Sequence, residues 1–208
     1  MASVASTTER TLLGALAGRL ELSWLIRAAA VLFVAVLTAA AAQVSVPLPF
    51  TPVPLTLTPM IVLLGGAALG SRLGMASQIV YLLAGVAGLP VFAASAVLPP
   101  GLLRLLGPTG GYLISYPLAA FVAGWLAERG FDRRYVTSVV AMAAGLAVIF
   151  AGGVAWLAWF AQPVNVGLAA ALGTGFYPFF PADLVKVLLA AAVLPSAWKL
   201  TGRRGQAD

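Results

Sequence analysis

The sequence predicts an all-α integral membrane protein: six transmembrane helices, both termini cytoplasmic, and apolar outer loops covering a ligand pocket. Two features of composition support this class. Of the 208 residues, 62% are apolar and only 9% are charged, whereas about a quarter of a soluble domain is charged. Because one span takes about 20 apolar residues, the chain has room for roughly six. The third observation is the uneven distribution of basic residues between the two sides of the predicted bundle.

Each predicted span is an apolar run between two breaks. Helices are expected over residues 24–43, 57–69, 75–89, 112–127, 135–160 and 182–198. The Pro-rich stretch VSVPLPFTPVPLT separates the first two, because proline removes backbone donors and favours extended structure. GSRLG, a second apolar loop, ERGFDRR and a small-residue connection form the later breaks. Outside the 24–199 membrane domain, we expect a polar cytoplasmic leader over 1–23 and a basic cytoplasmic tail over 200–208.

The basic residues set the topology. With the N-terminus inside, Arg104 is the only basic residue of the outer connections, and Lys186 lies within the sixth helix. The inner side carries the others: Arg10, Arg19, Arg27, Arg72, Arg129, Arg133, Arg134, Lys199, Arg203 and Arg204. An excess of Lys and Arg marks cytoplasmic connections. This asymmetry also places Asp183 and Lys186 near the outer side, below the two apolar loops.

Several function classes are excluded by what the sequence lacks. It contains no Cys and no His, which excludes thiol chemistry, disulfides, His-ligated metals, haem and a Ser-His-Asp triad. No G-x-x-x-x-G-K-[ST] loop is present, so the chain should not hydrolyse ATP. The net charge of +6 is spread beside the spans, which is a topology signal rather than a nucleic-acid site. These absences favour a binding chamber without metal or cofactor over an enzyme.

Asp183 and Lys186 form the most informative pair, in FFPADLVK at the head of the sixth helix. A charge within a membrane helix costs roughly 3 kcal/mol on insertion scales, and residues three apart share a helix face. One interpretation is structural: Asp183 meets the helix N-terminus and Lys186 is its ion-pair partner. The other is ligand recognition, since a carboxylate accepts N–H donors and an ammonium donates to a carbonyl. Together they match a urea or an amide.

A second group of candidates lies in GPTGGY, which opens the fourth helix and contains Gly110, Gly111 and Tyr112. Free N–H groups at a helix start can hold an anion, although Gly-rich turns are common. Arg104 could remain solvated at the membrane surface or clamp a carboxylate with its planar fork.

The third helix carries Gln78 and Tyr81 at positions that share a face. Such polar residues either bond helix to helix or contact a ligand. In the first helix, Ala35 and Ala39 form a small-xxx-small pair, which allows close helix approach. That pair would pack inside the bundle or dock a partner subunit.

Four runs together resemble the BioY family, the biotin-binding S components of energy-coupling-factor vitamin transporters. They are PLPFTPVPLTL, YLLAGVAGLPVF, GPTGGYLISY and FFPADLVK, in the family's order. The resemblance implies six helices around a vitamin site, with Asp183 and Lys186 contacting the ureido ring of biotin. It also implies that Ala35 and Ala39 face a transmembrane coupling subunit that works with a pair of ATPases, although some members work without such a module. Where the family often has Gln in a P-V-P-x-T-L-Q pattern, this chain has Thr58 followed by Pro59.

The chemistry of biotin suits these residues. Its ureido group has two N–H donors and one carbonyl, which Asp183 and Lys186 would satisfy, and its carboxylate needs donors from Arg104 or from the N–H groups near Gly110 and Gly111. The expected function is high-affinity biotin capture for uptake, in a multi-pass protein of a prokaryotic cell membrane. The alternatives are an S component for another vitamin, a membrane enzyme using Asp183 as general base on lipid, and a structural subunit without ligand.

Overall fold

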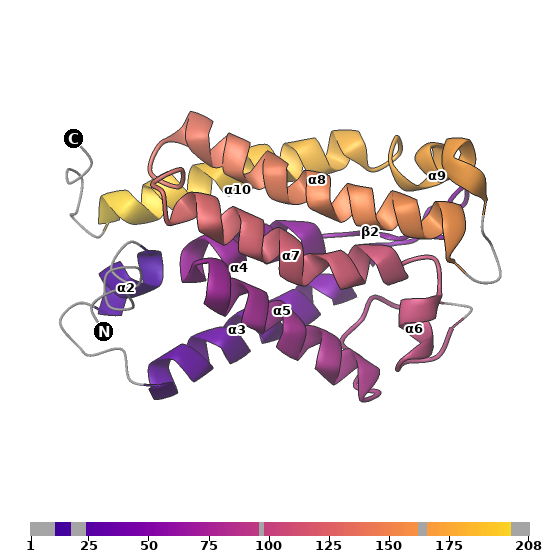
Figure 1. Ribbon diagram of the computed structural model, residues 1–208, viewed down its shortest axis with the longest axis horizontal. Helices are drawn as coiled ribbons and strands as arrows, with labels where there is room; N and C mark the ends of the chain where they lie inside the picture. The colour runs from indigo at the N-terminus through magenta and orange to yellow at the C-terminus, as the bar shows by residue number, and fades with distance from the viewer. Residues whose placement is uncertain (1–10, 18–23, 96–97, 162–165, 201–208) are drawn as a thin grey trace.

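The computed structural model describes residues 11–17, 24–95, 98–161 and 166–200, which form a helical bundle with one small hairpin (Figure 1). The hairpin pairs β1 (Ser45–Val46) with β2 (Leu55–Thr56), in antiparallel register with Ser45 opposite Thr56. The helices follow in chain order: α2 Leu12–Ala17, α3 Trp24–Gln43, α4 Thr58–Leu69, α5 Ser71–Val86, α6 Leu103–Leu106, α7 Gly110–Ala127, α8 Tyr135–Trp159, α9 Gly167–Gly175 and α10 Phe180–Leu200.

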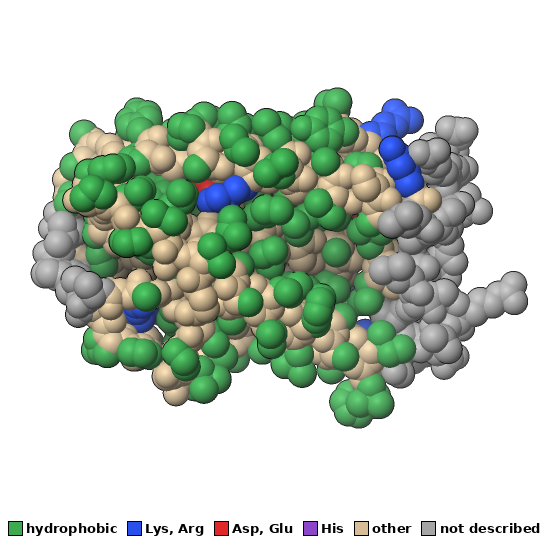
Figure 2. Space-filling view, turned by 180° about the vertical axis from the view of Figure 1, so that it is seen from behind, with side chains coloured by type: hydrophobic (Ala, Val, Ile, Leu, Met, Phe, Trp, Pro, Cys, Tyr) green, Lys and Arg blue, Asp and Glu red, His purple; other side chains and the backbone are tan. Residues whose placement is uncertain are grey.

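All six predicted spans are helical, but they differ in length. Within the part of the chain that the structure describes, four helices are long and apolar enough to cross a membrane: α3, α7, α8 and α10. α4 is apolar but has only 12 residues, and α5 has 16. The protein is therefore an all-α membrane protein with at least four candidate spans, and the count of six stays a prediction. Hydrophobic side chains are spread over the whole face seen in Figure 2, with few charged side chains among them.

α5 begins at Ser71 rather than at the predicted residue 75, because a distant carboxylate supplies its N-terminal partner. Glu128, just after α7, accepts the backbone N–H of Ser71 at 2.7 Å and its hydroxyl at 2.9 Å. A helix start leaves N–H groups without intrahelical partners, so this contact stabilises α5 at its first turn. Only Gly70, with φ +87°, separates α4 from α5.

The core is built on close backbone contacts between α4, α5 and α7. A Cβ added at Gly66 would lie 2.4 Å from the carbonyl oxygen of Ala120, and one at Gly124 would lie 2.5 Å from the backbone nitrogen of Ser71. A Cβ at Gly74 would lie 2.6 Å from the Cα of Gly66. Small residues let membrane helices approach this closely, so these glycines fix the bundle around which the other helices pack.

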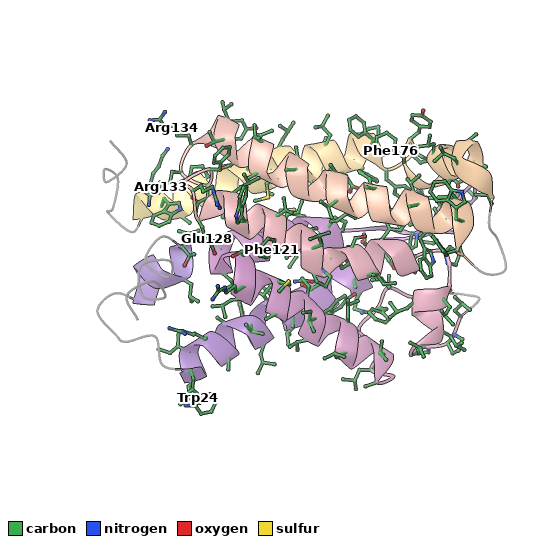
Figure 3. The ribbon with its side chains drawn as sticks, in the orientation of Figure 1. Trp24, Phe121, Glu128, Arg133, Arg134 and Phe176 are labelled. Carbon is green, nitrogen blue, oxygen red and sulfur yellow. The ribbon has the colours of Figure 1, made fainter. Side chains whose placement is uncertain are left out.

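Three local elements were not among the predictions: the hairpin, α6 and α9. The leader contains α2, whose Leu12 is buried in the core; the rest of the leader and most of the tail, including Arg10, Arg19, Arg203 and Arg204, lie outside the described residues. Figure 3 places Arg133, Arg134 and Glu128 at one end of the bundle and Phe176 at the other. The basic end predicted to be cytoplasmic is thus opposite the end where α9 lies.

Candidate ligand-binding site

A cavity of about 380 Å³ lies between the segment that joins β1 to β2, the loop before α6, and helices α5, α7, α8 and α10. Its volume and its mainly apolar lining with a few polar groups are typical of small-molecule sites. The polar and aromatic side chains of the lining are Thr51, Thr56, Thr58, Tyr81, Phe92, Ser95, Arg104, Thr109, Tyr112, Tyr116, Phe150, Phe179 and Asp183. The predicted site residues Asp183, Tyr81, Arg104 and Tyr112 are therefore brought to one cavity.

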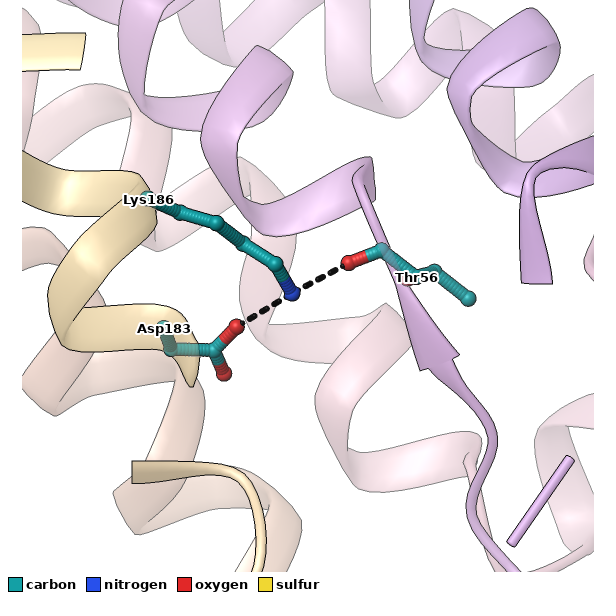
Figure 4. A network of polar contacts seen from close by, with 3 residues as sticks. All are labelled: Thr56, Asp183 and Lys186. Carbon is teal, nitrogen blue, oxygen red and sulfur yellow. Dashed lines mark hydrogen bonds and ion pairs between the residues drawn. The ribbon is translucent and has the colours of Figure 1, made fainter. Parts of the chain in front are cut away.

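Asp183 and Lys186 form a buried ion pair at one side of this cavity (Figure 4). The Lys186 Nζ donates to Asp183 Oδ1 at 2.7 Å and to the backbone carbonyl of Thr56 at 2.6 Å. The Lys186 side chain is 12% exposed and that of Asp183 is 8% exposed, and they meet because residues three apart lie on one helix face. Asp183 lines the cavity, whereas Lys186 is absent from the described lining. Lys186 instead contacts two residues that do line it, Asp183 and Thr56 of β2.

Arg104 lies in α6 and lines the same cavity. It is only 8% exposed, so it is not the solvated arginine that one sequence interpretation allowed. Its guanidinium donates to the carbonyl of Ala93, while its Nε has no partner among the described atoms. Burial lowers the pKa of Arg104. Tyr81 is 1% exposed, and its buried hydroxyl also lacks a described partner. Buried donors without partners are costly, and here both side chains line the cavity.

Two side chains that line the cavity form hydrogen bonds to the C-terminal end of α9. Thr51 donates its hydroxyl to the carbonyl of Thr174 at 2.6 Å, and Tyr112 donates to the carbonyl of Gly175 at 2.7 Å. The first bond ties the Pro-rich segment to α9 and the second ties α7 to it. The sequence predicts Tyr112 as a ligand contact but does not point to Thr51, Thr56 or α9. Their hydrogen bonds join segments more than 60 residues apart in the chain, which no local pattern reveals.

Gly110, Gly111 and Gln78 are absent from the described lining of the cavity. The Gly110 N–H donates to the carbonyl of Gly107 at 3.0 Å, and a Cβ on Gly111 would lie 2.2 Å from the Cβ of Trp156. These two glycines therefore let α7 pack closely on its neighbours. Gln78 donates to Thr38 of α3 at 3.3 Å, which is the helix-to-helix bond that the sequence offered as one alternative.

The predicted partner pair in α3 is not an exposed pair in this conformation. Ala35 is 6% exposed and belongs to the hydrophobic core, and Ala39 packs against that core half-buried. This placement matches packing inside the chain's own bundle. The exposed side of α3 carries larger apolar residues instead: Leu32, Phe33 and Val36.

Comparison with known proteins identifies the family. Residues 12–203 match the model of the BioY family. A probable biotin transporter BioY of Pyrococcus horikoshii is 43% identical over 162 residues, 78% of this chain and 89% of the relative. The biotin transporter BioY of Thermotoga maritima is 37% identical over 157 residues, 76% and 88% of the two chains. The crystal structure of an S-component for biotin from an ECF-type ABC transporter superposes with a TM-score of 0.76 at 23% identity, covering 88% of this chain and 95% of that one, and shares the fold. The chain belongs to the BioY family.

Proposed function

We propose that this protein captures biotin for uptake, as the membrane-embedded substrate-binding subunit of an energy-coupling-factor transporter. One observation carries the proposal. The cavity has at one place the Asp183 carboxylate, whose ion-pair partner is Lys186, and at another a buried arginine and tyrosine with unpartnered donors. Two polar groups joined by an apolar interior suit a ligand that is polar at both ends and apolar between them.

Biotin has this distribution of polarity. Its ureido ring offers two N–H donors and a carbonyl acceptor, which suit the Asp183 carboxylate and the Lys186 ammonium. Its carboxylate suits Arg104, because a planar guanidinium binds carboxylates through parallel hydrogen bonds. The Tyr81 hydroxyl adds a donor, and Tyr112 and Phe179 add aromatic walls for the fused ring and its chain. Gln78, Gly110 and Gly111 support this site from behind its walls.

We further infer six spans with both termini in the cytoplasm of a prokaryotic cell, since the described basic residues other than Arg104 and Lys186 flank the ends predicted to be internal. The leader over 1–23 and the tail over 200–208 belong to that side. Without an ATP-binding loop of its own, the chain takes energy from a coupling subunit and two ATPases where such a module is present. The exposed side of α3, which carries Leu32, Phe33 and Val36, is a candidate for that contact, whereas Ala35 and Ala39 would reach it only after a rotation of α3.

Binding by the purified chain tests the proposal. Isothermal titration in detergent should give saturable binding of biotin and of desthiobiotin, which keeps the ureido ring and the carboxylate. The methyl ester of biotin should bind at least about tenfold more weakly, because Arg104 then faces an ester rather than a carboxylate. Arg104→Gln should weaken biotin and hardly change the ester, whereas Arg129→Gln, outside the cavity, should change neither. Absence of biotin binding by the folded chain, or preference for another vitamin, would reject the proposal.

A further inference from the structure

A second cavity of about 560 Å³ lies on the flank of α8, α9 and α10. Several of its residues are exposed, including Ala147, Leu168 and Leu184. Because α8 and α10 are candidate spans, this groove opens toward the hydrocarbon of the bilayer. Its described lining is apolar throughout: Ala143, Leu146, Ala147, Phe150, Ala151, Val154, Ala155, Trp159, Leu168, Leu172, Phe176, Phe180, Leu184 and Val187.

α8 and α10 form the wall between this groove and the ligand cavity. Neighbouring residues of the N-terminal region of α10 face opposite sides: Phe179 and Asp183 line the ligand cavity, and Phe180 and Leu184 line the groove. On α8, Ile149 lines only the ligand cavity. Among the residues that the structure describes, Phe150 is the one that lines both. The Phe150 side chain therefore lies at the boundary between the ligand cavity and the groove and closes it; we call this boundary the seam.

The Phe150 ring is held in this position by its neighbours. It is 6% exposed and packs edge-on against Phe176, with ring centroids 4.9 Å apart and planes at 75°. Phe176 in turn lies 5.2 Å from the ring of Phe180 and stands at the end of the bundle where α9 lies (Figure 3). Paired aromatic rings of this kind restrain each other's orientation, so the seam stays closed without a change in the backbone.

We infer that Phe150 is a specificity-determining residue, which seals the ligand cavity against the hydrocarbon of the membrane. The inference rests on the proposed function, in that the sealed cavity is the one proposed for biotin. Both spaces have apolar walls, and an apolar chain at membrane concentration would fill any apolar space that it could enter. With Phe150 in place, the cavity admits a carboxylate-bearing ligand from the outer aqueous side and excludes lipid chains.

One arm of the test does not depend on biotin. The chain has no cysteine, so Leu113→Cys places a single thiol in the ligand cavity, which Leu113 lines. A methanethiosulfonate with a dodecyl chain is supplied from the bilayer of reconstituted vesicles. Adding Phe150→Ala should speed labelling at least about tenfold, and the smaller truncation Phe150→Val should speed it less. Leu172→Ala, which enlarges only the groove, should leave the rate unchanged.

A second arm measures competition. Decanoate should raise the apparent Kd for biotin at least about tenfold in Phe150→Ala and leave it unchanged in the parent chain and in Leu172→Ala. Failure of the parent chain to bind biotin would reject the proposed function while the labelling arm still tests the seal. Equal labelling rates with Phe, Val and Ala at position 150, in variants that elute as folded protein, would overturn the inference about Phe150.

Discussion

Replacing Lys186 by Met should show whether the Asp183–Lys186 pair serves ligand recognition or only the stability of the fold. The change keeps an unbranched apolar chain and removes the ammonium, which donates to Asp183 at 2.7 Å and to Thr56 at 2.6 Å. Asp183 would then keep a buried charge without its partner, and breaking such a pair costs about 3–5 kcal/mol. If about half of that cost falls on the bound state, the Kd for biotin rises roughly 10- to 100-fold. Titration calorimetry measures the Kd, and thermal unfolding in the same detergent measures stability.

The double variant Asp183→Asn with Lys186→Met completes this test. It removes both charges, so no unpaired charge remains and much of the lost thermal stability should return. Biotin binding should stay weak, because the ureido ring has lost both the carboxylate and the ammonium. A double variant that binds biotin as tightly as the parent chain would refute the reasoning and leave the pair with a structural role only.

Three further predictions concern the bundle rather than the ligand. Burial raises the pKa of Asp132, in the α7–α8 connection, from 3.8 to about 6, so the folded state loses stability as the pH rises from about 4 to 6 and does not regain it above 6. Asp132→Asn should therefore raise the unfolding temperature at pH 7.5 but not at pH 4, and the gain in free energy of unfolding at pH 7.5 should be about 2–3 kcal/mol at most. Glu128→Gln weakens the cap on Ser71 and should cost about 1–2 kcal/mol with an unchanged Kd for biotin; a changed Kd without loss of stability would contradict a capping role. Gly124→Ala should unfold at a clearly lower temperature, whereas Gly173→Ala, where an added Cβ meets nothing within 4 Å, should match the parent, and equal behaviour would rule out close packing as the cause.

The long helices could be predicted from the sequence because their signals are local. α3 ends where the apolar run meets the Pro-rich stretch, and its predicted range of 24–43 is confirmed. The predicted start of α5 is four residues late, because its cap is Glu128, 57 residues away in the chain. The hairpin and α9 have no comparable pattern: each strand has two residues, and α9 is a short run of small residues bounded by glycines.

In the candidate site too, contacts between residues close in the sequence could be predicted, whereas contacts between distant segments could not. Asp183 and Lys186 lie three residues apart, so helix geometry alone predicts their contact, and the structure confirms it. Helix geometry also put Gln78 beside Tyr81, but it could not show that only Tyr81 lines the cavity, since that depends on how α3 packs against α5. The burial of Arg104 arises from α6 and the carbonyl of Ala93, which belong to a loop without periodicity.

The short length of α4 has a consequence for the depth of the ligand cavity. Its 12 residues span about 18 Å, whereas a hydrocarbon core is about 30 Å thick. None of its residues is exposed, and it contacts α3, α5, α7, α8 and α10, so these longer neighbours rather than α4 meet the lipid. The bundle therefore keeps free depth above the first turn of α4, where Thr58 and Pro59 line the ligand cavity. Lengthening α4 by a turn at its N-terminus would fill that space with helix and leave less room for a ligand.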